Sequence, residues 1–122
     1  MTPTLAAFQR YVDATGATYN ETMQYLYITQ AQYARLQSLF FVVGDSTFEL
    51  IPNAQIWPRS LNSVIGGQMD LIYLVVQDIG EQDPGIDFIA GMQLLERVYS
   101  VFDTEHRLLG LAPTPYTYAE VN

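Results

Sequence analysis

The stretch that decides the fold is DFIAGMQLLERVYSVFDTEHRLLGLA, residues 87–112. It begins with a short apolar run, Phe88-Ile89, which stops at Gly91 and favours a strand that ends there. Residues Met92–Val98 follow with apolar side chains at helical spacing. The polar pair Glu96-Arg97 interrupts this spacing, so we predict that both side chains lie on the solvent side of the helix.

The second half of the same stretch has the pattern of a β-hairpin. Tyr99–Phe102 and Arg107–Leu111 are rich in residues that favour strands. The four residues between them, 103–106, are polar and favour a turn. The stretch as a whole therefore predicts a strand, a helix and a hairpin in succession.

The rest of the chain also has mainly strand patterns. Leu39–Val43 and Thr47–Leu50 flank a turn that contains Gly44 and predict a second hairpin. Met23–Ile28 alternates as a half-buried strand does, and the apolar run Asp70–Gln77 predicts a strand buried on both faces. Short helices are expected at Pro3–Val12, capped by Thr2, at Gln30–Leu36, and at Met92–Val98.

Length and charge restrict the class of protein. A chain of 122 residues with 49% hydrophobic residues can form one globular domain. Its five basic residues are single arginines and its net charge is −8, which argues against nucleic acid and against anionic membrane surfaces as partners. The sequence shows no signal peptide and no apolar run long enough to cross a bilayer.

The residue types needed for metal or cofactor chemistry are scarce. The chain has no cysteine and one histidine, so neither a zinc site nor thiol chemistry is expected. The acidic residues between 78 and 87 do not have the spacing of a calcium loop, which favours a solvated acidic loop. Gly66-Gly67 lacks the lysine of a phosphate-binding loop, and no cofactor is predicted.

Residues 87–112 resemble the end of the C-terminal lobe of pepsin-like aspartic peptidases. The shared pattern begins with two hydrophobic residues, any residue and a glycine, which here are Phe88, Ile89 and Gly91. A predicted helix follows, and after it come residues at fixed spacing: Tyr99, Val101, Phe102, Asp103, Arg107, Gly110 and Ala112. Three segments are most similar in sequence to the polyporopepsin-like branch of this family from wood-rotting fungi: Leu39–Phe41, Ile56–Asn62 and Ser100–Thr104. The resemblance extends from about Phe8 onward.

This resemblance implies a mainly β fold. We expect a single C-terminal lobe over residues 1–112, made of packed antiparallel sheets with two or three short helices. Residues 113–122 are expected to form a partly ordered tail, because they contain two prolines and follow the last predicted strand.

The family's catalytic motif is missing from the sequence. Pepsin-like peptidases use two aspartates, each in an Asp-Thr-Gly or Asp-Ser-Gly loop, and the chain contains neither string. The nearest is Asp13-Ala14-Thr15-Gly16, which the resemblance aligns with the end of a surface helix and to which we assign a structural role. The resemblance places the catalytic loop upstream of Met1, as in a truncated lobe, and no catalytic residue is predicted.

Two groups of residues are singled out as candidates. Trp57, Tyr73 and Val75 are weak candidates for residues that border a ligand or a substrate cleft, although Trp57 is also suited to anchor its loop. Phe88, Ile89, Gly91, Asp103 and Gly110 form the structural motif. Within it, Asp103 is expected to bind turn amides and Gly91 to tolerate no side chain.

Three functions remain open. The first is a stand-alone lobe without a catalytic aspartate that acts as a binding or interaction module and not as an enzyme. The second is the C-terminal part of an acid endopeptidase that is completed by a separate N-terminal lobe. A weaker third is a lobe that binds or converts a small apolar ligand.

The expected partners follow from these functions. They are a second copy of the chain, a missing N-terminal lobe, a peptide or a small apolar molecule. For a homodimer, the predicted contacts are Leu71–Val76, the first helix through Leu5 and Phe8, and Tyr99–Phe102. The family is secreted or vacuolar, but without a visible signal peptide the compartment stays open.

Overall fold

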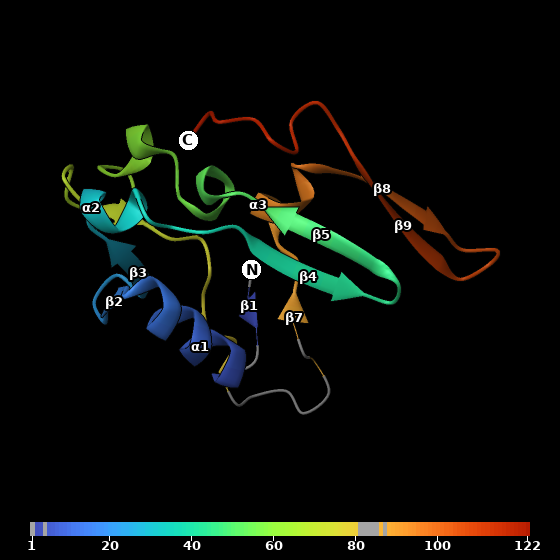
Figure 1. The fold of residues 1–122 in the computed structure, drawn as a ribbon, viewed down its shortest axis with the longest axis horizontal. Coiled ribbons are helices and arrows are strands. Elements are labelled where there is room, and N and C mark those ends of the chain that lie inside the picture. Colours follow the sequence, from blue (N-terminus) through green and yellow to red (C-terminus); the bar gives the residue numbers. More distant parts are fainter. Residues whose placement is uncertain (1, 4, 81–85, 87) are drawn as a thin grey trace.

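The computed structural model describes residues 2–3, 5–80, 86 and 88–122 (Figure 1). The helices are α1 (Leu5–Thr15), α2 (Gln30–Tyr33) and α3 (Met92–Leu95), with two 3-10 turns, η1 (Pro52–Gln55) and η2 (Arg59–Leu61). The strands are β1 (Thr2–Pro3), β2 (Thr18–Asn20), β3 (Tyr25–Ile28), β4 (Leu39–Val43), β5 (Ser46–Leu50), β6 (Ile72–Tyr73), β7 (Phe88–Ile89), β8 (Val98–Asp103) and β9 (Leu108–Pro113). All strand pairs are antiparallel, so the predicted mainly β fold with short helices is confirmed.

The larger core lies between α1 and the β2–β3–β6 sheet. Its buried side chains are Tyr11, Leu26, Ile28, Ile56, Ile72, Leu74 and Val76. Phe8 and Val12 pack against this cluster from α1, because residues three or four apart fall on one face of a helix. α1 ends at Thr15, and the next residue, Gly16, has a positive φ of 67°, the left-handed conformation that glycine favours after a helix.

A smaller core joins the two hairpins. Leu50, Ala54 and Leu94 are buried there, and Phe41 and Phe88 pack against them with their rings stacked 5.6 Å apart. Leu94 belongs to α3 and Leu50 to β5, so this cluster links the two halves of the chain. Figure 1 shows the β4–β5 and β8–β9 hairpins on the same side of the molecule, away from β2 and β3.

Both predicted hairpins are present. β4 pairs with β5 from Leu39↔Leu50 to Val43↔Ser46, and β8 pairs with β9 from Val98↔Pro113 to Asp103↔Leu108. Gly44, at φ 60°, provides the first turn. Both hairpins depend on contacts that are local in the sequence, which is why their patterns were sufficient to predict them.

Three sequence predictions need correction. Thr2 and Pro3 do not begin a helix: they form β1, which pairs with Ile89 and Phe88 of β7. The run Asp70–Gln77 is not one long strand, although it is buried from Ile72 to Val76; β6 pairs with β3 through two residues, and Leu74 adds an isolated bridge to Ile56.

The third correction concerns Arg97, which was expected to face solvent. It is 3% exposed, because the segment that follows β9 returns across the end of α3 and covers it. Glu96, in contrast, is exposed as predicted.

Candidate functional site

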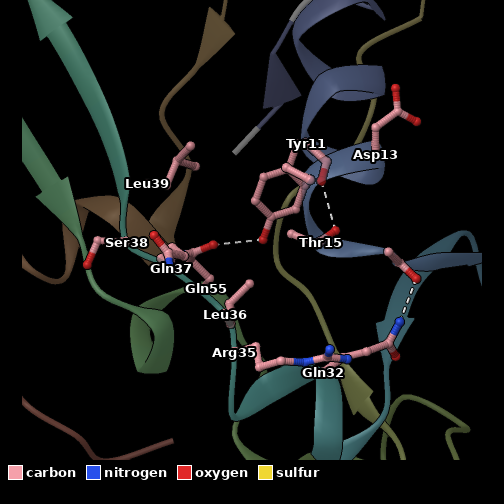
Figure 2. Close-up of a pocket in the computed structure, with 12 residues that line it drawn as sticks. Tyr11, Asp13, Thr15, Gln32, Arg35, Leu36, Gln37, Ser38, Leu39 and Gln55 are labelled. Carbon is pink, nitrogen blue, oxygen red and sulfur yellow. Dashed lines mark hydrogen bonds between the residues drawn. The ribbon is translucent and has the colours of Figure 1, made fainter.

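A cavity formed by described residues lies beside the end of α1 (Figure 2). It has a volume of about 500 Å³ and is formed by the last turn of α1, by α2 and by the segment that leads into β4. Its lining includes Tyr11, Asp13, Thr15, Gly16, Gln32, Arg35, Leu36, Gln37, Ser38, Leu39 and Gln55.

A buried hydrogen-bond network forms one wall of this cavity. The hydroxyl of Tyr11 donates to Oε1 of Gln55 at 2.9 Å (Figure 2). Gln55 is completely buried, and its Nε2 donates to the carbonyl oxygens of Gln37 and Leu50 at 2.8 and 3.0 Å. Every polar atom of this amide therefore has a partner, as a buried amide requires.

The burial of Tyr11 also makes the free energy of unfolding depend on pH in the alkaline range. Burial raises the pKa of its hydroxyl above the ordinary value for tyrosine. The unfolded chain therefore loses this proton first when the pH passes about 10, so the contribution of Tyr11 to stability is complete below that pH and is lost above it.

We expect Tyr11→Phe to lower the free energy of unfolding at neutral pH by about 1–2 kcal/mol, because Gln55 Oε1 would lose its donor. Between pH 9 and 11, the unmodified chain should lose stability more steeply than the variant does. Urea unfolding at several pH values measures both effects. Parallel pH profiles for the two proteins would contradict this role of Tyr11.

The cavity has no pair of carboxylates. Asp13 is the one acidic residue in its lining; it is exposed on α1 and accepts a hydrogen bond from Gln9 Nε2 at 2.9 Å. Figure 2 shows its side chain directed away from the Tyr11–Gln55 pair. Since an aspartic peptidase needs two adjacent carboxylates that share a proton, this cavity cannot carry out that chemistry.

The three candidate cleft residues lie in different environments. Tyr73 and Val75 are 1% and 5% exposed, and the hydroxyl of Tyr73 accepts a hydrogen bond from the backbone N–H of Gln68. In the described chain they are core residues, and a role at a cleft stays a prediction. Trp57 is half-buried, meets Tyr25 edge-on at 5.8 Å, and lines a cavity of about 360 Å³ with Leu61, Met92 and Tyr116.

The residues of the structural motif lie in and beside β7, α3 and the β8–β9 hairpin. Asp103 Oδ1 accepts a hydrogen bond from the backbone N–H of His106 at 3.0 Å, which is the predicted turn contact and lowers the pKa of the carboxyl group. Gly110 faces Val101 across the hairpin. Gly91 has φ −87° and ψ −176°, a conformation open to any residue, so backbone strain does not explain an intolerance there.

A polar cluster that the sequence did not reveal fixes the end of the chain. Arg97 Nη1 donates to the carbonyl oxygen of Ala119 at 2.5 Å, and Thr117 Oγ1 donates to the carbonyl oxygen of Arg97. Asn53 and Asn122 exchange two hydrogen bonds of 3.0 Å, from Asn53 Nδ2 to the Asn122 carbonyl and from the Asn122 N–H to Asn53 Oδ1. These partners are far apart in the sequence, so no local pattern indicates the cluster.

An apolar groove lies between the two hairpins. It has a volume of about 160 Å³, and its lining contains no charged or polar residue: Phe41, Val43, Phe48, Phe88, Ala90, Leu94, Leu95, Val98, Phe102, Leu109 and Leu111. Phe102 and Leu109 face each other across β8 and β9 and are 72% and 60% exposed. The groove is therefore an open apolar surface suited to binding another apolar surface.

The described residues contain neither a metal-binding cluster nor a membrane-spanning helix. Among the described residues there is no group of three or more histidine, aspartate or glutamate side chains that could hold a metal ion. No helix in the part of the chain that the structure describes is long and apolar enough to cross a membrane. Of the acidic residues between 78 and 87, only Asp78 lies within the described residues.

Comparison with known proteins supports the family resemblance. The chain is 53% identical over 117 residues to polyporopepsin from Irpex lacteus, a match that covers 95% of this chain and 34% of that protein. The crystal structure of the aspartic proteinase from Irpex lacteus superposes with a TM-score of 0.93 at 51% identity, over 99% of this chain and 36% of that one. No family model matches the sequence.

The sequence match and the structural match have similar percentages of identical residues and cover a similar share of the relative. The chain spans about a third of the length of the relatives that it matches, and nearly all of it is included in both alignments. In sequence and in structure, the chain is a relative of the fungal pepsin-like aspartic peptidases of the polyporopepsin type and corresponds to part of their fold.

Proposed function

We propose that this chain forms the C-terminal structural part of an acid endopeptidase, and that the catalytic aspartates belong to parts of the fold outside these 122 residues. The observation that carries this proposal is the 53% identity to polyporopepsin over 95% of the chain, combined with coverage of 34% of that protein.

The chemistry of the described residues supports a structural role for this chain, with the catalytic aspartates elsewhere. The sequence contains no Asp-Thr-Gly or Asp-Ser-Gly string, and the cavity beside α1 has a single carboxylate, Asp13, in its lining. A water molecule activated by two carboxylates is the nucleophile in this class of enzyme, so one isolated aspartate on a helix surface is insufficient. The chain would thus provide structure to the enzyme and not its acid–base groups.

The purified chain alone is expected to cleave no protein substrate. The assay is release of soluble peptides from acid-denatured globin near pH 3, with and without pepstatin. A homogeneous preparation should match the buffer blank in both conditions. Cleavage that pepstatin inhibits would show that the chain contains an active dyad and would overturn the proposal.

A second candidate function is a stand-alone binding module, which the apolar groove between the hairpins favours. A groove with an entirely apolar lining could accept apolar side chains of a peptide, or a small apolar molecule. The test is calorimetric titration with peptides from a globin digest and, separately, with benzene as the small probe. Saturable binding that Leu109→Asp abolishes would support this function, and no binding of either probe would exclude it.

A further inference from the structure

The turn that joins β2 to β3 contains the one Asn-x-Ser/Thr string of the sequence, Asn20-Glu21-Thr22. This string is the acceptor sequence for N-linked oligosaccharide, which is attached to the amide nitrogen of the asparagine. Asn53 and Asn62 are followed two positions later by glutamine and valine, and both are buried. Because a three-residue string arises easily by chance, the surroundings of Asn20 in the fold decide whether it can be used.

The side chain of Asn20 stabilises this turn through its oxygen and not through its nitrogen. Asn20 Oδ1 accepts hydrogen bonds from the backbone N–H groups of Thr22 and Met23, both at 3.0 Å. The N–H of Gln24 donates to the Asn20 carbonyl oxygen at 2.7 Å and closes the turn. Asn20 Nδ2 forms no hydrogen bond with any described residue. An N-linked sugar replaces one hydrogen of Nδ2 and leaves Oδ1 as an acceptor, so the modified turn would keep these bonds.

The neighbours of Asn20 in the turn are polar and exposed. Glu21, Thr22 and Gln24 are open to solvent, and Asn20 is half-buried. Burying a carboxylate such as that of Glu21 costs free energy unless the carboxylate gains a partner, so a turn of this composition is suited to water and not to a packed contact. A glycan is bulky and hydrophilic, and it needs a position of this kind.

The surface suited to contact with another polypeptide lies elsewhere. The exposed apolar residues Phe102 and Leu109 line the groove between the β4–β5 and β8–β9 hairpins, and Figure 1 shows these hairpins away from β2 and β3. Since the chain spans about a third of its relatives, that apolar surface suits the parts of the fold outside these residues. Two segments that were predicted to contact a second copy are not open to one: Ile72–Val76 are buried, and Phe8 packs against the larger core.

We propose that Asn20 accepts an N-linked oligosaccharide as the protein passes through the secretory path. This rests on the proposed function, because an enzyme whose two carboxylates share a proton works at acid pH and therefore outside the neutral cytosol. The co-reactant is an oligosaccharide carried on a lipid pyrophosphate. Asn20 Nδ2 loses one proton and bonds to C1 of the first N-acetylglucosamine, while the bond from C1 to the pyrophosphate oxygen breaks and its electron pair leaves with the lipid pyrophosphate. The acceptor string also requires the hydroxyl of Thr22.

The test is expression in yeast behind a cleavable secretion leader, once as residues 1–122 and once joined to the segments of polyporopepsin that the chain does not match. Trypsin cuts after Arg10 and Arg35 and releases residues 11–35, which contain a single asparagine, Asn20. Mass spectrometry of this peptide, taken from the medium and from the cell membranes, should show an attached oligosaccharide in both forms. Peptide N-glycosidase should remove the oligosaccharide and leave aspartate at position 20.

Three variants show whether the acceptor string is responsible. Asn20→Asp keeps the oxygen that accepts the two turn hydrogen bonds but removes the amide nitrogen, so it should abolish the modification in a folded chain. Thr22→Val removes the hydroxyl at nearly constant volume and should abolish the modification as well. Thr22→Ser is the matched control, since it keeps the hydroxyl and should keep the oligosaccharide.

Three results would overturn the proposal. An unmodified peptide 11–35 in both forms would show that Asn20 is not an acceptor. A modification that persists in Thr22→Val would show that the acceptor string is not responsible for it. Secretion of the joined form that improves when Asn20→Asp removes the glycan would show that the rest of the fold covers this turn. None of these results bears on the proposed function, which peptidase activity tests, so the two can fail separately.

Discussion

Gly67→Ala is expected to lower the free energy of unfolding by about 3 kcal/mol, within the range for steric overpacking of a core. A Cβ atom at this position would lie 2.4 Å from Cε2 and 2.7 Å from Cζ of the Tyr73 ring. The ring cannot move away easily, because Tyr73 is 1% exposed and its hydroxyl accepts a hydrogen bond from the N–H of Gln68 at 2.9 Å.

The neighbouring glycine provides the control. A Cβ at Gly66 would meet nothing within 4 Å, although its φ of 78° makes any side chain strained. Gly66→Ala should therefore cost about 1 kcal/mol, the conformational penalty alone. Chemical denaturation of both variants measures the difference. Equal effects at the two positions would show that the Tyr73 ring is not held against Gly67.

Arg97→Met is expected to lower the free energy of unfolding by about 3 kcal/mol and to release residues 114–122 from the body of the protein. The guanidinium group is buried, which lowers its pKa, while the charge of Glu96 opposes that shift. Methionine fills a similar apolar volume but leaves the carbonyl oxygen of Ala119 and Oδ1 of Asn53 without the donors that Arg97 provides.

Two measurements separate loss of the contact from general destabilisation. Limited proteolysis of Arg97→Met should cut within residues 114–122 under conditions in which the rest of the chain stays intact. Arg10→Met, at an exposed position of α1, is the control and should change neither stability nor proteolysis. A proteolytic pattern for Arg97→Met identical to that of the unmodified chain would mean that Arg97 does not hold this segment.

The sequence predicted those features whose cause is local. Both hairpins depend on residues that are close together in the sequence, and their strand patterns and turn residues were sufficient to predict them. From helical spacing, Arg97 was predicted on the solvent side. That prediction was wrong because the segment that buries Arg97 comes 17 to 22 residues later in the chain.

Site features likewise could be predicted where they depend on a local sequence motif, and could not where they depend on segments far apart in the chain. The absence of an Asp-Thr-Gly string is visible in the sequence itself. The apolar groove was not predicted, because it joins the β4–β5 hairpin to a hairpin more than 40 residues away. The weak assignment of Trp57 to a cleft border stays a prediction, and only the folded chain shows that Trp57 shares a cavity with Tyr116 and Met92.

The most direct test of the proposed function is complementation. The chain would be refolded together with a polypeptide that carries the segments of polyporopepsin it does not match, and each would also be assayed alone. The proposal predicts globin cleavage at acid pH that pepstatin inhibits, found in the mixture and in neither component. A mixture that forms a stable complex yet stays inactive, or a component that is fully active without the other, would contradict it.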